Sequence, residues 1–180
     1  MIDFKHRIII DHDEWKSLTK EELEKEGSIE GFFQICVNSK TYGYYHDKVL
    51  QNGEEGFDLI STWYENLLKG VHLLYDKTHI AIKDIETEKM WISLAREANS
   101  IRVQVVESSY SAVDAITLDE VSHSSTCVWE ESEDFCIFVD QLLRRAREFL
   151  HELTLINTSF RLTNSFQTIE RLIGAIETME

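Results

Sequence analysis

A run of four polar residues, Asp11–Glu14, offers the side chains of a metal-dependent hydrolase. The run directly follows the apolar residues Ile8–Ile10, and ligands often stand at the end of a strand. Imidazole and carboxylate groups bind zinc and related ions, and a further histidine follows a later strand. A small hydrolase built on this set would use four side chains: Asp11, His12, Asp13 and His46.

Local geometry opposes a metal site at this position. Consecutive residues of an extended chain point to opposite sides, so neighbours in the run cannot all face one ion. Polar residues are also the ordinary way to end an apolar strand. We therefore expect a protein with no metal ion and no other cofactor, and we keep the metal-dependent hydrolase as an alternative function.

The cysteines match neither a zinc site nor a disulfide framework. Cys127 and Cys136 lie nine positions apart with His123 nearby, but a fourth zinc ligand at the usual spacing is missing. We expect both to be buried structural thiols. With Cys36 they make an odd number, which favours reduced thiols in a cytoplasmic protein. The seven histidines show no nucleophile signature, and the seven glycines show no phosphate-loop spacing.

Three helices are predicted from apolar residues that recur every three or four positions. The first covers about Phe57–Tyr75. The second covers Ser132–Leu153, with Ser132 as a good N-cap. The third covers Ser165–Thr178 and is opened by Asn164 in the pattern of a capping box. The last two helices are expected to pair in antiparallel orientation.

Strands are predicted where apolar and polar residues alternate between turn residues. The alternation is plainest where Ile101, Val103 and Val105 share one face. The predicted strands are Lys5–Ile10, Ile29–Val37, Thr41–His46, His79–Ile85, Met90–Arg96, Ile101–Glu107 and Cys127–Trp129. Their order favours an α+β fold: a mainly antiparallel sheet, with the three helices packed on one face. A length of 180 residues fits a single domain over residues 1–180.

The chain is strongly acidic, with 33 acids, 18 bases and a formal net charge of −15. Nucleic acids and anionic membrane surfaces require clustered Lys and Arg, so both are disfavoured as partners. No base occurs from Val103 to Leu143, whereas nine acids do: Glu107, Asp114, Asp119, Glu120, Glu130, Glu131, Glu133, Asp134 and Asp140. Such a surface suits a basic protein partner, and we assign partner binding to the densest group: Glu130, Glu131, Glu133 and Asp134.

Two aromatic side chains are predicted to stand on an open sheet face. If Phe33 faces the core, Phe32 faces outward, and the same alternation turns Trp91 outward in its own strand. Together with Tyr45 they would form the kind of surface that binds proteins, so Phe32 and Trp91 are candidate partner-binding residues. Alternatively, the segment around Trp15 covers this face, and both aromatics belong to the core.

The order of five segments, spread over most of residues 29–155, carries a family resemblance. They are Tyr42–His46, Ser61–Leu68, Met90–Leu94, Ile101–Val103 and Phe138–Leu153. This layout resembles small acidic bacterial immunity proteins, the cytosolic antidotes encoded beside polymorphic or contact-dependent toxins. The resemblance implies an inhibitor that binds one basic toxin domain, often a nuclease. It lies in general layout, so it transfers no functional residue.

The leading hypothesis is a non-enzymatic acidic binding protein, in its most concrete form an immunity protein that neutralises a basic toxin domain. Acids would speed the encounter, and aromatics would anchor the partner at short range. The alternatives are the small hydrolase and an oligomeric regulatory or scaffold module whose aromatic face is covered by its own copy. No apolar run approaches the roughly 18 residues of a membrane span, and residues 1–20 lack a signal-peptide apolar region, which favours a cytoplasmic protein.

Overall fold

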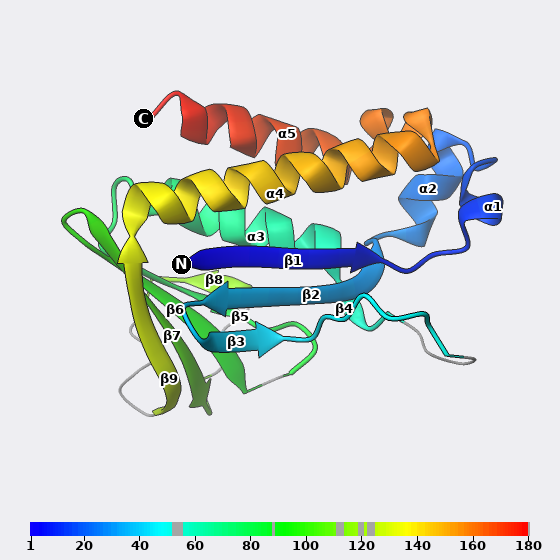
Figure 1. Cartoon of the computed structure of the whole chain (residues 1–180). Coiled ribbons are helices and arrows are strands. Elements are labelled where there is room, and N and C mark those ends of the chain that lie inside the picture. Colours follow the sequence, from blue (N-terminus) through cyan, green and yellow to red (C-terminus); the bar gives the residue numbers. More distant parts are fainter. Residues whose placement is uncertain (52–55, 88, 111–113, 119–120, 122–124, 180) are drawn as a thin grey trace.

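The computed structural model describes residues 1–51, 56–87, 89–110, 114–118, 121 and 125–179, without the side chain of His12 (Figure 1). The strands are β1 (Ile2–Ile8), β2 (Glu30–Val37), β3 (Lys40–Gly43), β4 (Asp58–Leu59), β5 (His79–Lys83), β6 (Met90–Glu97), β7 (Ser100–Ser108), β8 (Ile116–Thr117) and β9 (Ser125–Asp134). The helices are α1 (His12–Trp15), α2 (Lys20–Glu26), α3 (Ile60–Leu73), α4 (Phe135–Ile156) and α5 (Asn164–Glu177), with the 3₁₀ helix η2 (Thr158–Leu162).

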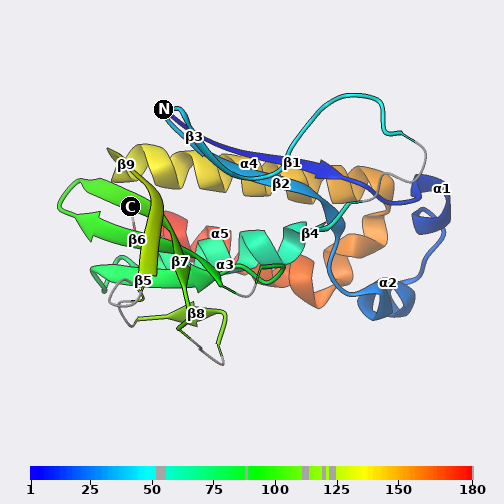
Figure 2. The ribbon, with the colours of Figure 1, turned by 90° about the horizontal axis from the view of Figure 1, so that it is seen from below.

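The α+β class with antiparallel pairing is confirmed, but the strands form two sheets and not one. Sheet A has the order β1-β2-β3, and β4 also pairs with β2. Sheet B has the order β8-β5-β6-β7-β9. Figure 2, seen from below, shows both sheets in front of the long helices α3, α4 and α5. Helix α3 packs against β2 and β5, so it joins the two sheets through one shared core.

The prediction of three helices is wrong in number, because the described residues form five α-helices. The three predicted helices correspond to α3, α4 and α5. Helices α1 and α2 are short and lie before β2, where too few turns exist for an apolar period to be recognised. A local signal for α2 was nevertheless present: Thr19 caps the helix by accepting from the Glu22 N–H, and the Glu22 carboxylate accepts from the Thr19 N–H.

All three predicted helix starts are shifted, and α3 begins at Ile60 and not at about Phe57. Helix α4 begins at Phe135 and not at Ser132, because β9 continues to Asp134 in register with β7. The Asp134 carboxylate is the N-cap and accepts from the Ile137 N–H at 3.0 Å. At α5 the cap is Thr163 and not Asn164. Ser, Asp, Thr and Asn all make good caps, so sequence identity alone does not choose among neighbours of these types.

The main core lies between the helices and the inner faces of both sheets. Ile101, Val103 and Val105 of β7 are buried in it, as their alternation predicted. Helix α3 approaches β5 closely, because Gly70 lets the helix pass near Ile80; a Cβ at Gly70 would lie 2.7 Å from the Ile80 Cδ1. None of the helices in the described part of the chain has the length and apolar character of a membrane crossing.

A charged link fixes α4 against β1. Arg145 of α4 donates to both carboxylate oxygens of Asp3 in β1, at 2.8 and 3.0 Å. It also donates to Glu148 at 2.8 Å. These bonds, Asp3 first, raise the pKa of the Arg145 guanidinium above its usual range. A bidentate pair of this kind fixes orientation as well as distance, so β1 and α4 present their outer residues in one arrangement.

The outer face of sheet B is covered, which overturns the prediction of an open face at Trp91. Trp91 is fully buried and forms a second core cluster with Ala81, Val106 and Val121. The Tyr110 ring packs edge-on against Trp91 at a centroid distance of 5.7 Å. Both Val121 and Tyr110 come from the connection between β7 and β9. Trp91 is therefore a core residue, not a partner-binding one.

The segment that covers the outer faces is not the one expected either. The ring of Trp15 stacks on Phe160 of η2 at a centroid distance of 5.9 Å. The N-terminal helices are held there because the Asn157 side chain donates to the carbonyls of Trp15 and Leu18 at 2.9 and 2.8 Å. The region around Trp15 thus covers the end of α4 and leaves the outer sheet faces to other segments.

Candidate functional site

The four acids assigned to partner binding lie on β9, the edge strand of sheet B, but they do not share one face. Glu130 stands opposite Gln104 on the outer face, where it accepts from the Gln104 amide and lies 3.7 Å from Arg102. Glu131 stands opposite Val103 on the other face and accepts from the Asn38 side chain at 2.8 Å. Alternation along a strand splits consecutive acids between two directions.

The other two acids of this group have structural partners. The Glu133 carboxylate lies 2.5 Å from the N-terminal ammonium of Met1. The hydrogen bond to this ammonium group lowers the pKa of Glu133. Asp134 caps α4. Of the other acids in the base-free run, Glu107, Asp114 and Asp140 are exposed, and Asp119 and Glu120 lie outside the described residues. Some acids of the predicted acidic surface therefore form contacts within the fold.

Phe32 lies on the outer face of sheet A, as predicted, but it is fully buried. Three rings cover it at centroid distances of 5.2, 4.8 and 5.8 Å: Tyr44, His46 and Phe57. The predicted strand to His46 ends early, at Gly43. The backbone there has φ +83°, and a Cβ would lie 2.2 Å from the Phe33 carbonyl oxygen. Only glycine fits this turn, which sends the chain back over Phe32.

The rings over Phe32 form the main exposed aromatic surface that the fold creates at this end of sheet A. We call Tyr44, His46 and Phe57 the aromatic patch. Tyr44 is 46 % exposed and Phe57 is 53 % exposed, and their rings lie 5.8 Å apart. Val49, which follows shortly after in the chain, is 90 % exposed. Large apolar side chains gathered in this way mark interaction sites more often than solitary exposed ones do.

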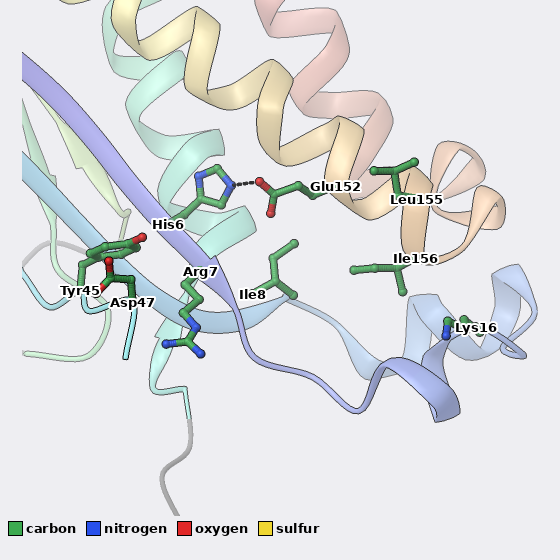
Figure 3. Close-up of a pocket in the computed structure, with 9 residues that line it drawn as sticks. All are labelled: His6, Arg7, Ile8, Lys16, Tyr45, Asp47, Glu152, Leu155 and Ile156. Atoms are coloured by element: carbon green, nitrogen blue, oxygen red, sulfur yellow. Dashed lines mark ion pairs between the residues drawn. The ribbon is translucent and has the colours of Figure 1, made fainter. Parts of the chain in front are cut away.

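Tyr45 and Asp47, from the 44–48 segment that carries part of the aromatic patch, line a hollow of about 490 Å³. Arg7 of β1 fixes this segment, because its Nη1 donates to the carbonyl oxygens of His46 at 3.0 Å and Lys48 at 2.7 Å. Figure 3 shows the lining side chains, which come from β1, the turn after α1, the 44–48 segment and the C-terminal end of α4. They are His6, Arg7, Ile8, Lys16, Tyr45, Asp47, Glu152, Leu155 and Ile156.

His6 is the buried polar residue of this hollow, with a side chain only 3 % exposed. Its Nδ1 lies 2.6 Å from the Tyr64 hydroxyl, and its Nε2 lies 3.4 Å from a carboxylate oxygen of Glu152. Burial raises the pKa of Tyr64 well above its usual range, so the phenol keeps its proton. In the tautomer of His6 that carries its proton on Nε2, the hydroxyl donates to Nδ1 and the Nε2–H faces Glu152.

The residues proposed for a hydrolase serve other roles. Asp11 accepts from the N–H groups of Asp13 and Glu14 at the start of α1. Asp13 pairs with Lys16 at 3.2 Å, and His46 packs on Phe32. The side chain of His12 lies outside the described residues. Within the described ranges, no three His, Cys, Asp or Glu side chains are grouped so that they could hold a metal ion.

The expectation of buried thiols is wrong for Cys127 and Cys136. Both are exposed and free. Cys127 stands opposite Val106 where a bulge shifts the register of β9, and Cys136 lies on the outer side of the first turn of α4. His123 lies outside the described residues. The apolar character of cysteine did not predict burial here. Both cysteines lie on the polar side of an amphipathic element.

A buried carboxylate pair between the sheets was not predicted. Asp58 accepts from the Phe33 N–H at 3.0 Å. Asp84 accepts from the Tyr42 hydroxyl and from the Glu86 N–H at 2.8 Å. Burial first, and then repulsion from Asp84, raises the pKa of Asp58 to about 6. The sequence offered one signal for a buried carboxylate, because Asp58 interrupts the apolar run from Phe57 to Ile60.

No family model matches the chain, and neither the curated proteins nor the solved structures contain a match. Function is therefore argued from the site itself.

Proposed function

We propose that this protein is a non-enzymatic binding protein for a basic protein partner. Its most concrete form is a cytoplasmic immunity protein that neutralises a basic toxin domain. The aromatic patch carries the proposal: half-exposed Tyr44 and Phe57 stand over buried Phe32 in a chain of net charge −15. Aromatic residues in such positions dominate the energy of protein interfaces.

The aromatic patch is arranged in advance for binding. Gly43 sets the turn that leads into it, and Arg7 holds the following backbone through two carbonyl groups. Rings already packed against Phe32 lose little side-chain entropy when a partner docks. This surface takes the place of Phe32 and Trp91, which were expected to contact the partner directly.

The acids act at longer range in this proposal. Glu130 and Asp134 are exposed, and Glu131 is half-buried, so their field reaches solvent although each has an internal partner. Electrostatic steering needs no direct contact, because it acts over about the 8–10 Å Debye length at physiological salt. The aromatic patch would then determine how long the complex lasts, and the acids how fast it forms.

An oligomeric module is the main competing function, because the aromatic patch could be covered by a second copy of the chain. Analytical ultracentrifugation distinguishes the two functions, because it measures the oligomeric state. A binding protein of this kind stays monomeric without its partner, whereas an oligomeric module does not. The immunity form has a further test in the neighbouring gene. A basic product of that gene, toxic alone and harmless when this chain is coexpressed, is the expected result. A neighbouring product that forms no complex would contradict the immunity form.

Truncating the aromatic patch should weaken the complex without unfolding the protein. We expect Phe57→Ala and Tyr44→Ala each to lower affinity for the neighbouring gene product by about 2 kcal/mol, mainly through faster dissociation. Leu162, which is exposed on η2, supplies the control variant Leu162→Ala. Surface plasmon resonance measures the rates. Equal effects of all three variants would place the interface elsewhere.

Removing charge from β9 should slow association. We expect the triple variant Glu130→Gln, Glu131→Gln, Asp134→Asn to associate roughly tenfold more slowly at low salt, with little change in dissociation. Asparagine keeps the cap of α4 in this variant. A matched triple variant removes three exposed acids from scattered positions: Glu26→Gln, Asp76→Asn and Glu170→Gln. Equal slowing by both sets, or association that ignores salt, would remove β9 from the steering surface.

A further inference from the structure

Strand β1 has an open backbone edge at the hollow. Among the described strands, β1 lies at the end of sheet A and pairs only with β2. The Ile9 N–H, which directly follows β1, donates to the Glu30 carbonyl at 3.1 Å. Because main-chain groups alternate in direction along an antiparallel strand, the odd-numbered residues of β1 bond to β2. The N–H and C=O groups of His6 and Ile8 therefore point away from β2.

The bonds made by β2 agree with this direction. Phe33 stands opposite His6 in the register of the two strands. The Phe33 N–H donates to the Asp58 carboxylate at 3.0 Å, and the Phe33 carbonyl accepts from the Tyr44 N–H at 2.9 Å. Both bonds lie on the side of β2 that faces away from β1. His6 and Phe33 thus form a pair that exchanges no hydrogen bonds, and the main chain of His6 is directed to the outer edge of sheet A.

Helix α4 covers one part of this edge and leaves another part open. Phe4 is fully buried, and its ring packs edge-on against Phe138 of α4 at a centroid distance of 5.3 Å. His6 differs, because its side chain is only 3 % exposed while the residue as a whole is partly exposed. The accessible surface of His6 therefore belongs mainly to its main chain. Open strand edges are templates for pairing with another chain, and most proteins cover them.

The hollow beside this edge has the walls that an added strand requires. Leu155 and Ile156 of α4 face Ile8 of β1 across it, and Leu155 is 71 % exposed (Figure 3). Successive side chains of an added strand would point to opposite sides, so alternate ones would cover this apolar wall. In strand addition the main-chain bonds supply affinity, and the contacts of alternate side chains supply specificity.

The 44–48 segment contributes to both the hollow and the aromatic patch. Tyr44 and His46 carry rings of the aromatic patch, whereas Tyr45 and Asp47 line the hollow. Alternate residues of one short segment thus belong to two surfaces. A single partner that docks on the aromatic patch can therefore also reach the hollow.

The net charge of the chain selects the occupant. The charged residues that line the hollow are two of each sign: Arg7, Lys16, Asp47 and Glu152. A second copy of the chain would bring together two molecules of net charge −15, which repel each other, whereas a basic segment is attracted. We propose that an extended segment of the basic partner enters the hollow and adds to the open edge of β1 as a further strand of sheet A. This docking mode rests on the proposed function, because it concerns the same partner.

Amide hydrogen exchange, followed by NMR on the isotope-labelled whole chain, tests the pairing directly. The probe is the neighbouring gene product, the protein that also tests the proposed function. In the complex, the amides of His6 and Ile8 should exchange at least about tenfold more slowly than in the free chain, because the added strand supplies their acceptors. The Arg7 amide is the internal control. It bonds to β2 in both states, so its exchange should slow much less.

Ile8→Pro and Ile8→Ala form a matched pair of variants. Both remove the isoleucine side chain, but only proline also removes the outward N–H. Proline is tolerated on an edge strand where the N–H faces outward. We expect Ile8→Pro to bind the neighbouring gene product roughly tenfold more weakly than Ile8→Ala, because an acceptor of the added strand is left without a donor. Circular dichroism checks that both variants keep the fold; if Ile8→Pro unfolds, the amide exchange of the wild type decides.

The outcomes separate this docking mode from the proposed function. A complex in which the amides of His6 and Ile8 stay unprotected would overturn strand addition and leave the binding function in place. Equal affinity of folded Ile8→Pro and Ile8→Ala would do the same. Absence of any complex would overturn both. Protection of the two amides in the chain alone, together with a dimer in sedimentation, would mean that a second copy occupies the edge, and would also overturn the proposal.

Discussion

Trp91→Ala should lower the free energy of unfolding by about 3–5 kcal/mol, the usual cost of truncating a tryptophan in a core. Trp91 is fully buried among Ala81, Val106 and Val121, and Tyr110 packs against its ring. The neighbouring side chains are too small to fill the cavity that removal of the indole would leave. A urea titration measures the change, which should appear as a lower midpoint at an unchanged slope.

An exposed apolar residue of the same sheet serves as the control for Trp91. Val128 lies on β9 and is more than half exposed, so Val128→Ala should change the free energy of unfolding by less than about 0.5 kcal/mol. A loss below about 1 kcal/mol for Trp91→Ala would mean that the connection between β7 and β9 does not cover this face in solution. In that case Trp91 would return as a candidate contact for a partner.

Asp58→Asn should stabilise the protein at neutral pH and leave it unchanged in acid. The pKa of Asp58 is about 6 in the folded protein, against an ordinary value of 3.8. Because the folded pKa is raised, the stabilising contribution is full below about pH 4 and is lost as pH rises through about 6. One pKa unit corresponds to about 1.4 kcal/mol, so the variant should gain up to about 3 kcal/mol at pH 8.

The structural reason is that burial and the nearby Asp84 both disfavour a negative charge on Asp58. Asp58 accepts the Phe33 N–H, a bond that asparagine can also make through its carbonyl oxygen. The substitution therefore removes the charge that Asp84 repels and keeps the hydrogen bond. Thermal unfolding of both proteins from pH 3 to pH 8 measures the difference, with Asp76→Asn as an exposed control. The raised pKa would be contradicted if the stability of Asp58→Asn and that of the wild type changed in parallel with pH across this range.

The two predictions concern the covered outer faces of the sheets and the boundary between them. Asp58 directly follows Phe57 of the aromatic patch, and its hydrogen-bond partner Phe33 directly follows Phe32. The carboxylate at Asp58 is therefore linked through the backbone to two residues of that region, Phe57 and Phe32. Partner binding and stability should therefore be measured on the same Asp58→Asn variant.

Periodicity predicted the elements that are long enough to repeat their pattern. Helices α3, α4 and α5 and strands β6 and β7 all coincide with runs in which apolar residues recur regularly. Their boundaries were less certain, because Ser132 and Asp134 are both good caps and only the pairing of β9 with β7 decides between them. Helices α1 and α2 are shorter than the repeats that make a helix recognisable.

By itself, the sequence determined the α+β class, the inward faces of the long elements and the acidic character of the surface, because each depends on residue type and spacing along the chain. The tertiary structure alone decided what covers Phe32 and Trp91. Alternation predicts on which face of a strand a side chain lies. Whether that side chain is buried depends on which distant segment packs over the face. The hollow has the same origin, since Arg7, Asp47 and Glu152 come from three distant segments that only the fold brings together.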